Sequence, residues 1–96
     1  MKLSYVKLTE QELHAALETL PSWTVSDGRL QREFTFSNYK EGVVFASAVG
    51  WEADRLNHHP DMTVSYGKVT VSTVTHDSDG LTPYDVELAR LVDSLV

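Results

Sequence analysis

Residues 23–36 read WTVSDGRLQREFTF, and this stretch decides the fold class. From Leu30 to Phe36 every second residue is apolar except Arg32, which is the two-residue period of a strand with one buried face. The Asp-Gly pair at positions 27–28 is typical of a tight hairpin turn. The stretch therefore predicts an antiparallel hairpin. We expect the stem of Arg32 to lie along the apolar face, with its charge at an edge.

The rest of the chain adds a second hairpin and three helices. Residues 62–66 and 68–75 are rich in Val and Thr, which favour strands, and Gly67 separates them. Helices are expected from the Thr9 cap to Leu20, over residues 39–56, and from Thr82 onward. The order helix, strand, strand, helix, strand, strand, helix predicts an α+β two-layer sandwich. Its four-stranded, largely antiparallel sheet would carry three helices on one face, in a single domain over residues 1–96.

The last predicted helix is apolar around most of its circumference, so its apolar residues do not form one stripe. A helix of this kind is either buried on two sides or lies in a subunit interface. Because the chain has only 96 residues, we expect the interface. The open face or edge of the sheet is a second place where copies of the chain would meet.

Composition excludes several functional classes. Eight Lys and Arg residues against 14 Asp and Glu residues give a net charge of −6, which argues against nucleic acid or an anionic membrane as a partner. The absence of cysteine excludes disulfides, thiolate metal sites and cysteine nucleophiles. The chain has no signal peptide and no apolar run of membrane-spanning length, so we expect a cytoplasmic protein.

Three of the four histidines fall at joints between predicted elements: His58 and His59 in a His-His-Pro turn, and His76 after the fourth strand. Imidazole exchanges a proton near neutral pH, so a cluster of histidines suits general acid–base catalysis. Asp54, one helical turn before His58, would orient one ring. Two alternatives stay open. One is a metal site completed by Asp61 or Asp77, although no chelating spacing is present; the other is a set of polar loop residues without a function.

The spacing of these residues resembles the pattern of the pterin-4a-carbinolamine dehydratase family. The matching residues, in chain order, are Asp54, His58, His59, Pro60, Tyr66, His76 and Asp85. Residues 75–82 and the upstream Trp23 also fit, so the resemblance covers nearly the whole chain. Three positions depart from the family: Asp54 stands where glutamate is common, Met62 where tryptophan is frequent, and Tyr84 where arginine often occurs.

The resemblance implies 4a-hydroxytetrahydrobiopterin dehydratase activity, the loss of water from 4a-hydroxytetrahydropterin to give quinonoid dihydropterin. This reaction recycles the cofactor of an aromatic amino-acid hydroxylase and needs no metal or other cofactor. The resemblance also implies a homodimer or homotetramer, formed through the last helix and the sheet edge. Eukaryotic members double as a dimerization cofactor of a homeodomain transcription factor, so a non-catalytic dimerization or assembly scaffold is the alternative.

Site residues follow from the resemblance position by position. The catalytic set is His58, His59, His76 and Asp54, with His58 and His76 as the leading acid–base pair and Asp54 orienting the His58 side. The pterin-binding set is His58, His59, Pro60, Thr75, His76, Asp77 and Ser78. Trp23 and Asp85 are expected to support the site.

Overall fold

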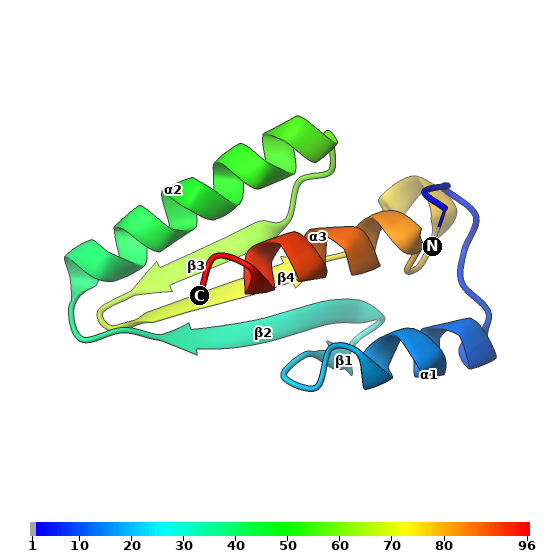
Figure 1. Ribbon diagram of the computed structural model, residues 1–96, viewed down its shortest axis with the longest axis horizontal. Helices are drawn as coiled ribbons and strands as arrows, with labels where there is room; N and C mark the ends of the chain where they lie inside the picture. The colour runs from blue at the N-terminus through cyan, green and yellow to red at the C-terminus, as the bar shows by residue number, and fades with distance from the viewer. Residues whose placement is uncertain (1) are drawn as a thin grey trace.

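The computed structural model describes residues 2–96 and contains one antiparallel sheet in the order β1-β2-β4-β3. In chain order the elements are α1 (Glu10–Glu18), β1 (Thr24–Ser26), β2 (Arg29–Thr35), α2 (Tyr39–Leu56), β3 (Asp61–Ser65), β4 (Lys68–Thr73), the short 3-10 helix η1 (His76–Ser78) and α3 (Pro83–Asp93). Figure 1 shows α2 running along β3, with α3 crossing the middle of the sheet and α1 beside β1. The predicted α+β class and element order are confirmed.

The local signals in the sequence account for the element boundaries. Thr9 and Glu12 form a reciprocal capping box at the start of α1, and Asn38 caps α2 by accepting the backbone N–H of Glu41. Asp27 and Gly28 both have positive φ, +53° and +73°, as a two-residue type I′ hairpin turn requires. The predicted β1–β2 hairpin therefore has the turn geometry that its sequence favours.

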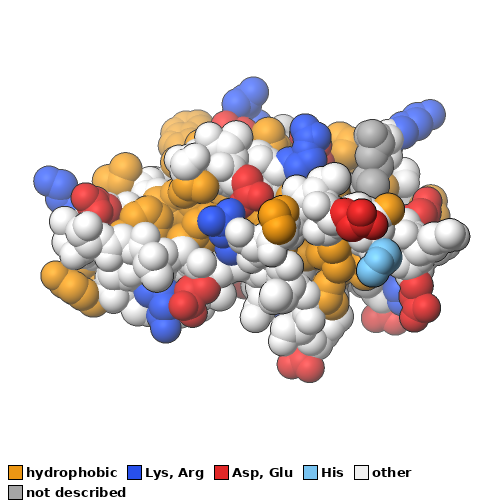
Figure 2. All heavy atoms as spheres, turned by 60° about the horizontal axis from the view of Figure 1, so that its bottom comes forward, with side chains coloured by type: hydrophobic (Ala, Val, Ile, Leu, Met, Phe, Trp, Pro, Cys, Tyr) orange, Lys and Arg blue, Asp and Glu red, His pale blue; other side chains and the backbone are white. Residues whose placement is uncertain are grey.

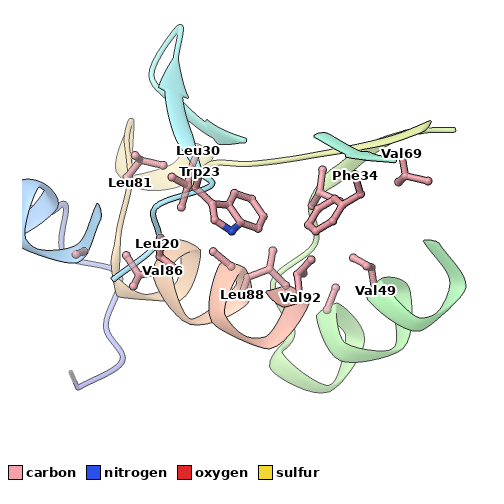
Figure 3. Packing of buried hydrophobic residues seen from close by; sticks show 14 of the residues in the cluster. Leu20, Trp23, Leu30, Phe34, Val49, Val69, Leu81, Val86, Leu88 and Val92 are labelled. Atoms are coloured by element: carbon pink, nitrogen blue, oxygen red, sulfur yellow. The ribbon is translucent and has the colours of Figure 1, made fainter. Parts of the chain in front are cut away.

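The register of the sheet directs one face inward. Leu30 pairs with Thr73 and Phe34 pairs with Val69, and all four side chains are buried. All three helices lie on this side of the sheet, as Figure 3 shows, and α3 brings Leu88 beneath Trp23. The opposite face carries the intervening polar residues of β2, β3 and β4 and is open. The core is therefore a single layer between sheet and helices.

The expectation that α3 lies in a subunit interface is wrong for most of its surface. Val86, Leu88, Ala89 and Val92 are all buried within this one chain. The helix lies on the sheet beside α2, and its buried side chains belong to the same core cluster as those of the sheet, α2 and the α1 region. Burial on two sides, the alternative reading of the same pattern, is what the structure has.

Asp93 at the end of α3 fastens that helix to the sheet. Its Oδ1 accepts hydrogen bonds from the Trp23 indole N–H and from the Arg32 guanidinium, both at 2.8 Å. The Arg32 guanidinium also lies 4.3 Å from the centre of the Phe34 ring, so its charge is placed at the edge of the apolar face as expected. Trp23 thus belongs to the core, where its indole is 4% exposed.

Asp85, in the first turn of α3, is fully buried and ionised. Its carboxylate accepts hydrogen bonds from the hydroxyls of Thr73 and Thr75, the backbone N–H of Thr82 and the His58 ring, at 2.6, 2.8, 3.0 and 2.7 Å. Burial alone raises the pKa of a carboxyl, but these hydrogen bonds outweigh it and hold the pKa of Asp85 below its ordinary value. One side chain therefore caps α3 and ties it to β4 and to the end of α2.

Charged side chains are spread over the surface of the molecule. On the face drawn in Figure 2, acidic and basic side chains are interspersed, and the basic ones are not gathered into one patch. Within residues 2–96, no helix combines the length and the apolar character needed to cross a membrane.

Replacing Asp85 by Asn should destabilise the fold in a pH-dependent way. The lowered pKa means that folding favours the ionised carboxylate, which contributes stability above about pH 4 and loses it as pH falls through the folded-state pKa. At pH 7 we expect Asp85→Asn to lower the free energy of unfolding by about 2–4 kcal/mol. The gap to wild type, measured by urea denaturation, should narrow toward pH 3.

Asp27→Asn, at an exposed carboxylate in the β1–β2 turn, serves as the control and should change stability little at either pH. Should Asp85→Asn not fold, Thr73→Val removes one of the four donors while keeping the side-chain shape. A gap between wild type and Asp85→Asn that stays constant from pH 7 to pH 3 would contradict the assignment.

Candidate active site

A hollow of about 610 Å³ lies at the end of the sheet where α2 ends and β4 passes into η1. Its volume falls within the range of small-molecule sites. The lining residues come from three separate segments of the chain. They are Tyr5, Asn57, His58, His59, Val74, Thr75, His76, Asp77 and Ser78. The fold thus brings together the three histidines that the sequence singled out.

The way α2 ends sends His58 and His59 in different directions. Asn57 adopts the left-handed conformation, with φ +54°. The backbone N–H groups of Asn57 and His58 bond back to the carbonyls of Asp54 and Ala53, in the pattern of a Schellman motif. The chain turns sharply at Asn57, so His58 points inward and is 8% exposed, while His59 stays exposed at the rim.

His58 is held by the ionised Asp85. The distance from its Nε2 to Asp85 Oδ1 is 2.7 Å, and both side chains are buried. A carboxylate only accepts hydrogen bonds, so Nε2 carries a proton and Nδ1 of the neutral ring keeps a free lone pair. The His58 ring is therefore fixed in one tautomer, with one nitrogen available as a proton acceptor.

Asp54 lies beside His59 and not beside His58, which corrects the predicted pairing. Its Oδ1 is 3.2 Å from His59 Nε2, and both side chains are exposed. The prediction assumed that α2 continues to His58, which would place Asp54 and His58 one turn apart. Because the left-handed Asn57 ends the helix first, the next residue along takes the position above Asp54.

The other wall is the turn after β4. Thr75 and Gly80 form an isolated bridge that closes the loop around η1, and His76 and Asp77 stand exposed at its start. The hydroxyls of Thr75 and Ser78 are already engaged, the first by Asp85 and the second by the backbone carbonyl of Tyr5. Their side chains shape the hollow, whereas His76 and Asp77 are its unengaged polar groups on this side.

Five residues of the sequence pattern do not line the hollow: Asp54 and Asp85 pair with lining histidines from outside it, and the other three are Trp23, Tyr66 and Pro60. Trp23 sits in the core, tied to Asp93, and so does not support the site directly. Tyr66 is 76% exposed in the β3–β4 turn, at the opposite end of β4 from His76. Pro60 is half-buried and does not line the hollow; it stands directly before β3.

Tyr5 is a lining residue that sequence reasoning missed. Its ring stacks on Tyr84 with the centroids 4.4 Å apart and the planes 16° from parallel. Desolvation, the neighbouring Tyr84 hydroxyl and the Asp77 carboxylate raise the pKa of the Tyr5 phenol, which keeps it protonated at neutral pH. Tyr5 lies in a stretch without helical or strand periodicity, so the only signal was the aromatic side chain itself.

The described residues provide no metal centre. Among residues 2–96, no three His, Asp or Glu side chains converge closely enough to hold an ion. Asp61, one of the acids considered for such a site, instead pairs with Arg29 at 2.5 Å. What the hollow does offer is three imidazoles, a group able to transfer protons: His58 is buried against Asp85, and His59 and His76 are exposed.

Known proteins are similar to this chain in sequence and in fold. The sequence profile of the family described as pterin 4 alpha carbinolamine dehydratase matches residues 6–95. A relative from Picosynechococcus sp. is 42% identical over 93% of this chain and 97% of its own, and one from Sulfurisphaera tokodaii is 41% identical over 94% and 97%. Both carry the provisional name pterin-4-alpha-carbinolamine dehydratase.

A solved structure is similar as well. The transcriptional coactivator/pterin dehydratase from Brucella melitensis superposes with a TM-score of 0.87 at 31% identity, covering 93% of this chain and 97% of that one. With a profile match over nearly the whole length and two relatives above 40% identity, the chain belongs to the pterin 4 alpha carbinolamine dehydratase family.

Proposed function

We propose that this chain, acting as a single domain in the cytoplasm, dehydrates 4a-hydroxytetrahydropterin to quinonoid dihydropterin. In this reaction the bond from C4a to its hydroxyl oxygen breaks, and a proton supplied to that oxygen releases water. The N5 proton leaves to a base, and its electron pair forms the C4a=N5 double bond. The reaction needs one acid and one base on the same ring, and no electrons are exchanged.

The observation that carries the proposal is the His58–Asp85 pair at a hollow bordered by two more histidines. The Nε2–H group of His58 donates a hydrogen bond to Asp85, so the lone pair on Nδ1 is free to accept a proton. The buried carboxylate stabilises the imidazolium that forms when Nδ1 takes a proton. We assign His58 as the base that removes the N5 proton. This assignment uses the one histidine whose tautomer the fold fixes.

His76 is the proposed acid for the departing hydroxyl. It reaches the hollow from the opposite wall and is exposed to water that can reprotonate it. His59, paired with Asp54 at the rim, would bind an edge of the pterin. The same rim contains the carboxylate of Asp77, a hydrogen-bond acceptor for the amino and amide N–H groups of the ring.

The substrate indicates which reaction must precede this one. A 4a-hydroxytetrahydropterin forms when a tetrahydropterin gives up electrons to activate oxygen, so a pterin-dependent hydroxylase must supply it. We propose that the chain returns the cofactor of such an aromatic amino-acid hydroxylase to its cycle.

An assembly role is a second proposal, and it rests on α2. Val44 and Trp51 stand exposed on the outer side of this helix, with Trp51 72% exposed. Trp51 forms one side of a shallow hollow that Ser47, Gly50 and Asp54 also line. A projecting indole next to a hollow on the same helix suits a two-fold contact, in which the Trp51 of each copy fills the hollow of the other. We propose a homo-oligomer built on this face, in place of the α3 contact first expected.

Substitution of the histidines tests the catalytic proposal. The rate of quinonoid dihydropterin formation from chemically made 4a-hydroxytetrahydropterin is followed by absorbance. Wild type should accelerate it over buffer, and His58→Ala and His76→Ala should each lower kcat about a hundredfold or more, because each removes a positioned proton-transfer group. His14→Ala is the matched control, since His14 lies exposed on α1 outside the hollow, and its kcat should stay within twofold of wild type. The absence of acceleration by folded wild-type protein would refute the dehydratase proposal.

Substitution of Trp51 tests the assembly proposal. Wild type should elute as a dimer or tetramer of the 10.8 kDa chain in size-exclusion chromatography with light scattering. Trp51→Glu should shift it toward the monomer, because the charge cannot be desolvated in an apolar contact. Tyr66→Glu alters an equally exposed aromatic residue at the β3–β4 turn and should leave the mass unchanged. A monomeric wild type, or an oligomer that survives Trp51→Glu, would count against this face.

A further inference from the structure

The segment before α1 passes over the edge of the candidate site and is fastened there at two points. The Ser78 hydroxyl donates to the Tyr5 carbonyl at 2.5 Å, and the backbone N–H of Leu8 donates to the Leu81 carbonyl at 2.8 Å. Figure 1 shows this segment beside η1 and the start of α3. Residues 5–8 are therefore held at the edge of the site, and Tyr5 is the one among them that lines the hollow.

The ring of Tyr5 is positioned by a second aromatic residue behind it. Tyr84 contacts Tyr5 by stacking and also approaches the His58 ring, with the two centroids 5.7 Å apart. Tyr5 and His58 line the hollow, whereas Tyr84 does not. Tyr84 therefore backs both lining rings, and it holds Tyr5 at a defined distance from the histidine that we assign as the base.

The part of Tyr5 that Tyr84 leaves uncovered is available to a ligand. Tyr5 is 53% exposed even though its backbone is pinned and its ring is stacked. A large aromatic side chain held rigid yet half-uncovered at the mouth of a hollow offers contact area at little cost in conformational entropy. Met62, which stands where the family often has tryptophan, does not line the hollow. Within residues 2–96, the sole aromatic carbocycle that lines the hollow is that of Tyr5.

We propose that Tyr5 is a substrate-binding residue of this site, whose ring contacts the flat pyrimidine portion of a pterin and sets its position relative to His58. The choice of a pterin as ligand rests on the proposed function. The N1–C2–N3–C4 portion stays flat as water leaves C4a, so the contact has the same strength in the ground state and in the transition state. Such uniform binding changes KM and leaves kcat alone.

The test compares Tyr5→Ala, Tyr5→Phe and Val6→Ala with wild type. Val6 is the matched control, because it is exposed in the same segment and does not line the hollow. Two quantities are measured: the Kd for 7,8-dihydrobiopterin, a stable pterin, by fluorescence titration, and KM and kcat for dehydration. Far-UV circular dichroism checks that each variant is folded.

Tyr5→Ala should raise both Kd and KM about three- to tenfold, the range expected for one aromatic contact, while kcat stays within twofold. Tyr5→Phe keeps the ring and should bind within twofold of wild type, as should Val6→Ala. An unchanged Kd and KM in Tyr5→Ala would overturn the inference, and so would a wild type that does not bind the dihydropterin.

The two proposals fail separately. Wild-type protein that binds the dihydropterin through Tyr5 but does not accelerate dehydration would sink the dehydratase proposal and support this one. A wild type that accelerates dehydration with Tyr5→Ala unaffected would do the reverse.

Discussion

The carboxylate of Asp85 is the constraint on which the rest of the structure depends. An ionised group with no exposure to water is unfavourable unless hydrogen-bond donors surround it, and here two threonine hydroxyls, a backbone N–H and an imidazole do so. Those donors come from β4 and the segment just after it, from the N-cap of α3 and from the second residue after α2. The same hydrogen bonds that make the buried charge tolerable therefore fix where three elements meet, and the hollow lies at that meeting point.

Much of the fold was readable from the sequence because its signals are local. The caps at Thr9, Asn38 and Thr82 and the turn at Asp27 act within a few residues, and the structure confirms the elements that they bound. The error over α3 has a different origin. An apolar circumference indicates how much of a helix is covered, but it does not indicate what covers the helix. In the structure, the sheet and α2 pack against α3.

The sequence singled out the three histidines that meet at the hollow, but it did not predict their partners. The three histidines stand in the polar joints of the sequence, and the topology brings those joints together. The partner of each ring depends on backbone geometry that spacing does not encode. Because the left-handed Asn57 ends α2, Asp54 pairs with His59 and not with His58. His58 pairs instead with Asp85, 27 residues away in the chain. Tyr5 escaped prediction for a related reason, since its position depends on contacts with Ser78 and Tyr84, which are distant in the sequence.

These pairings also separate the histidines by environment, although they are the same residue type. His58 is buried, bound to an ionised carboxylate and fixed in one tautomer, whereas His76 is exposed to water. A reaction that takes a proton from one atom and gives one to another needs groups that differ in this way. The oriented histidine, His58, follows the rigid end of α2, and the water-accessible one, His76, begins the short helix η1. Two residues of the same type therefore provide one oriented group and one group in contact with water. The fold thus provides two histidines of the different kinds that the proposed reaction requires.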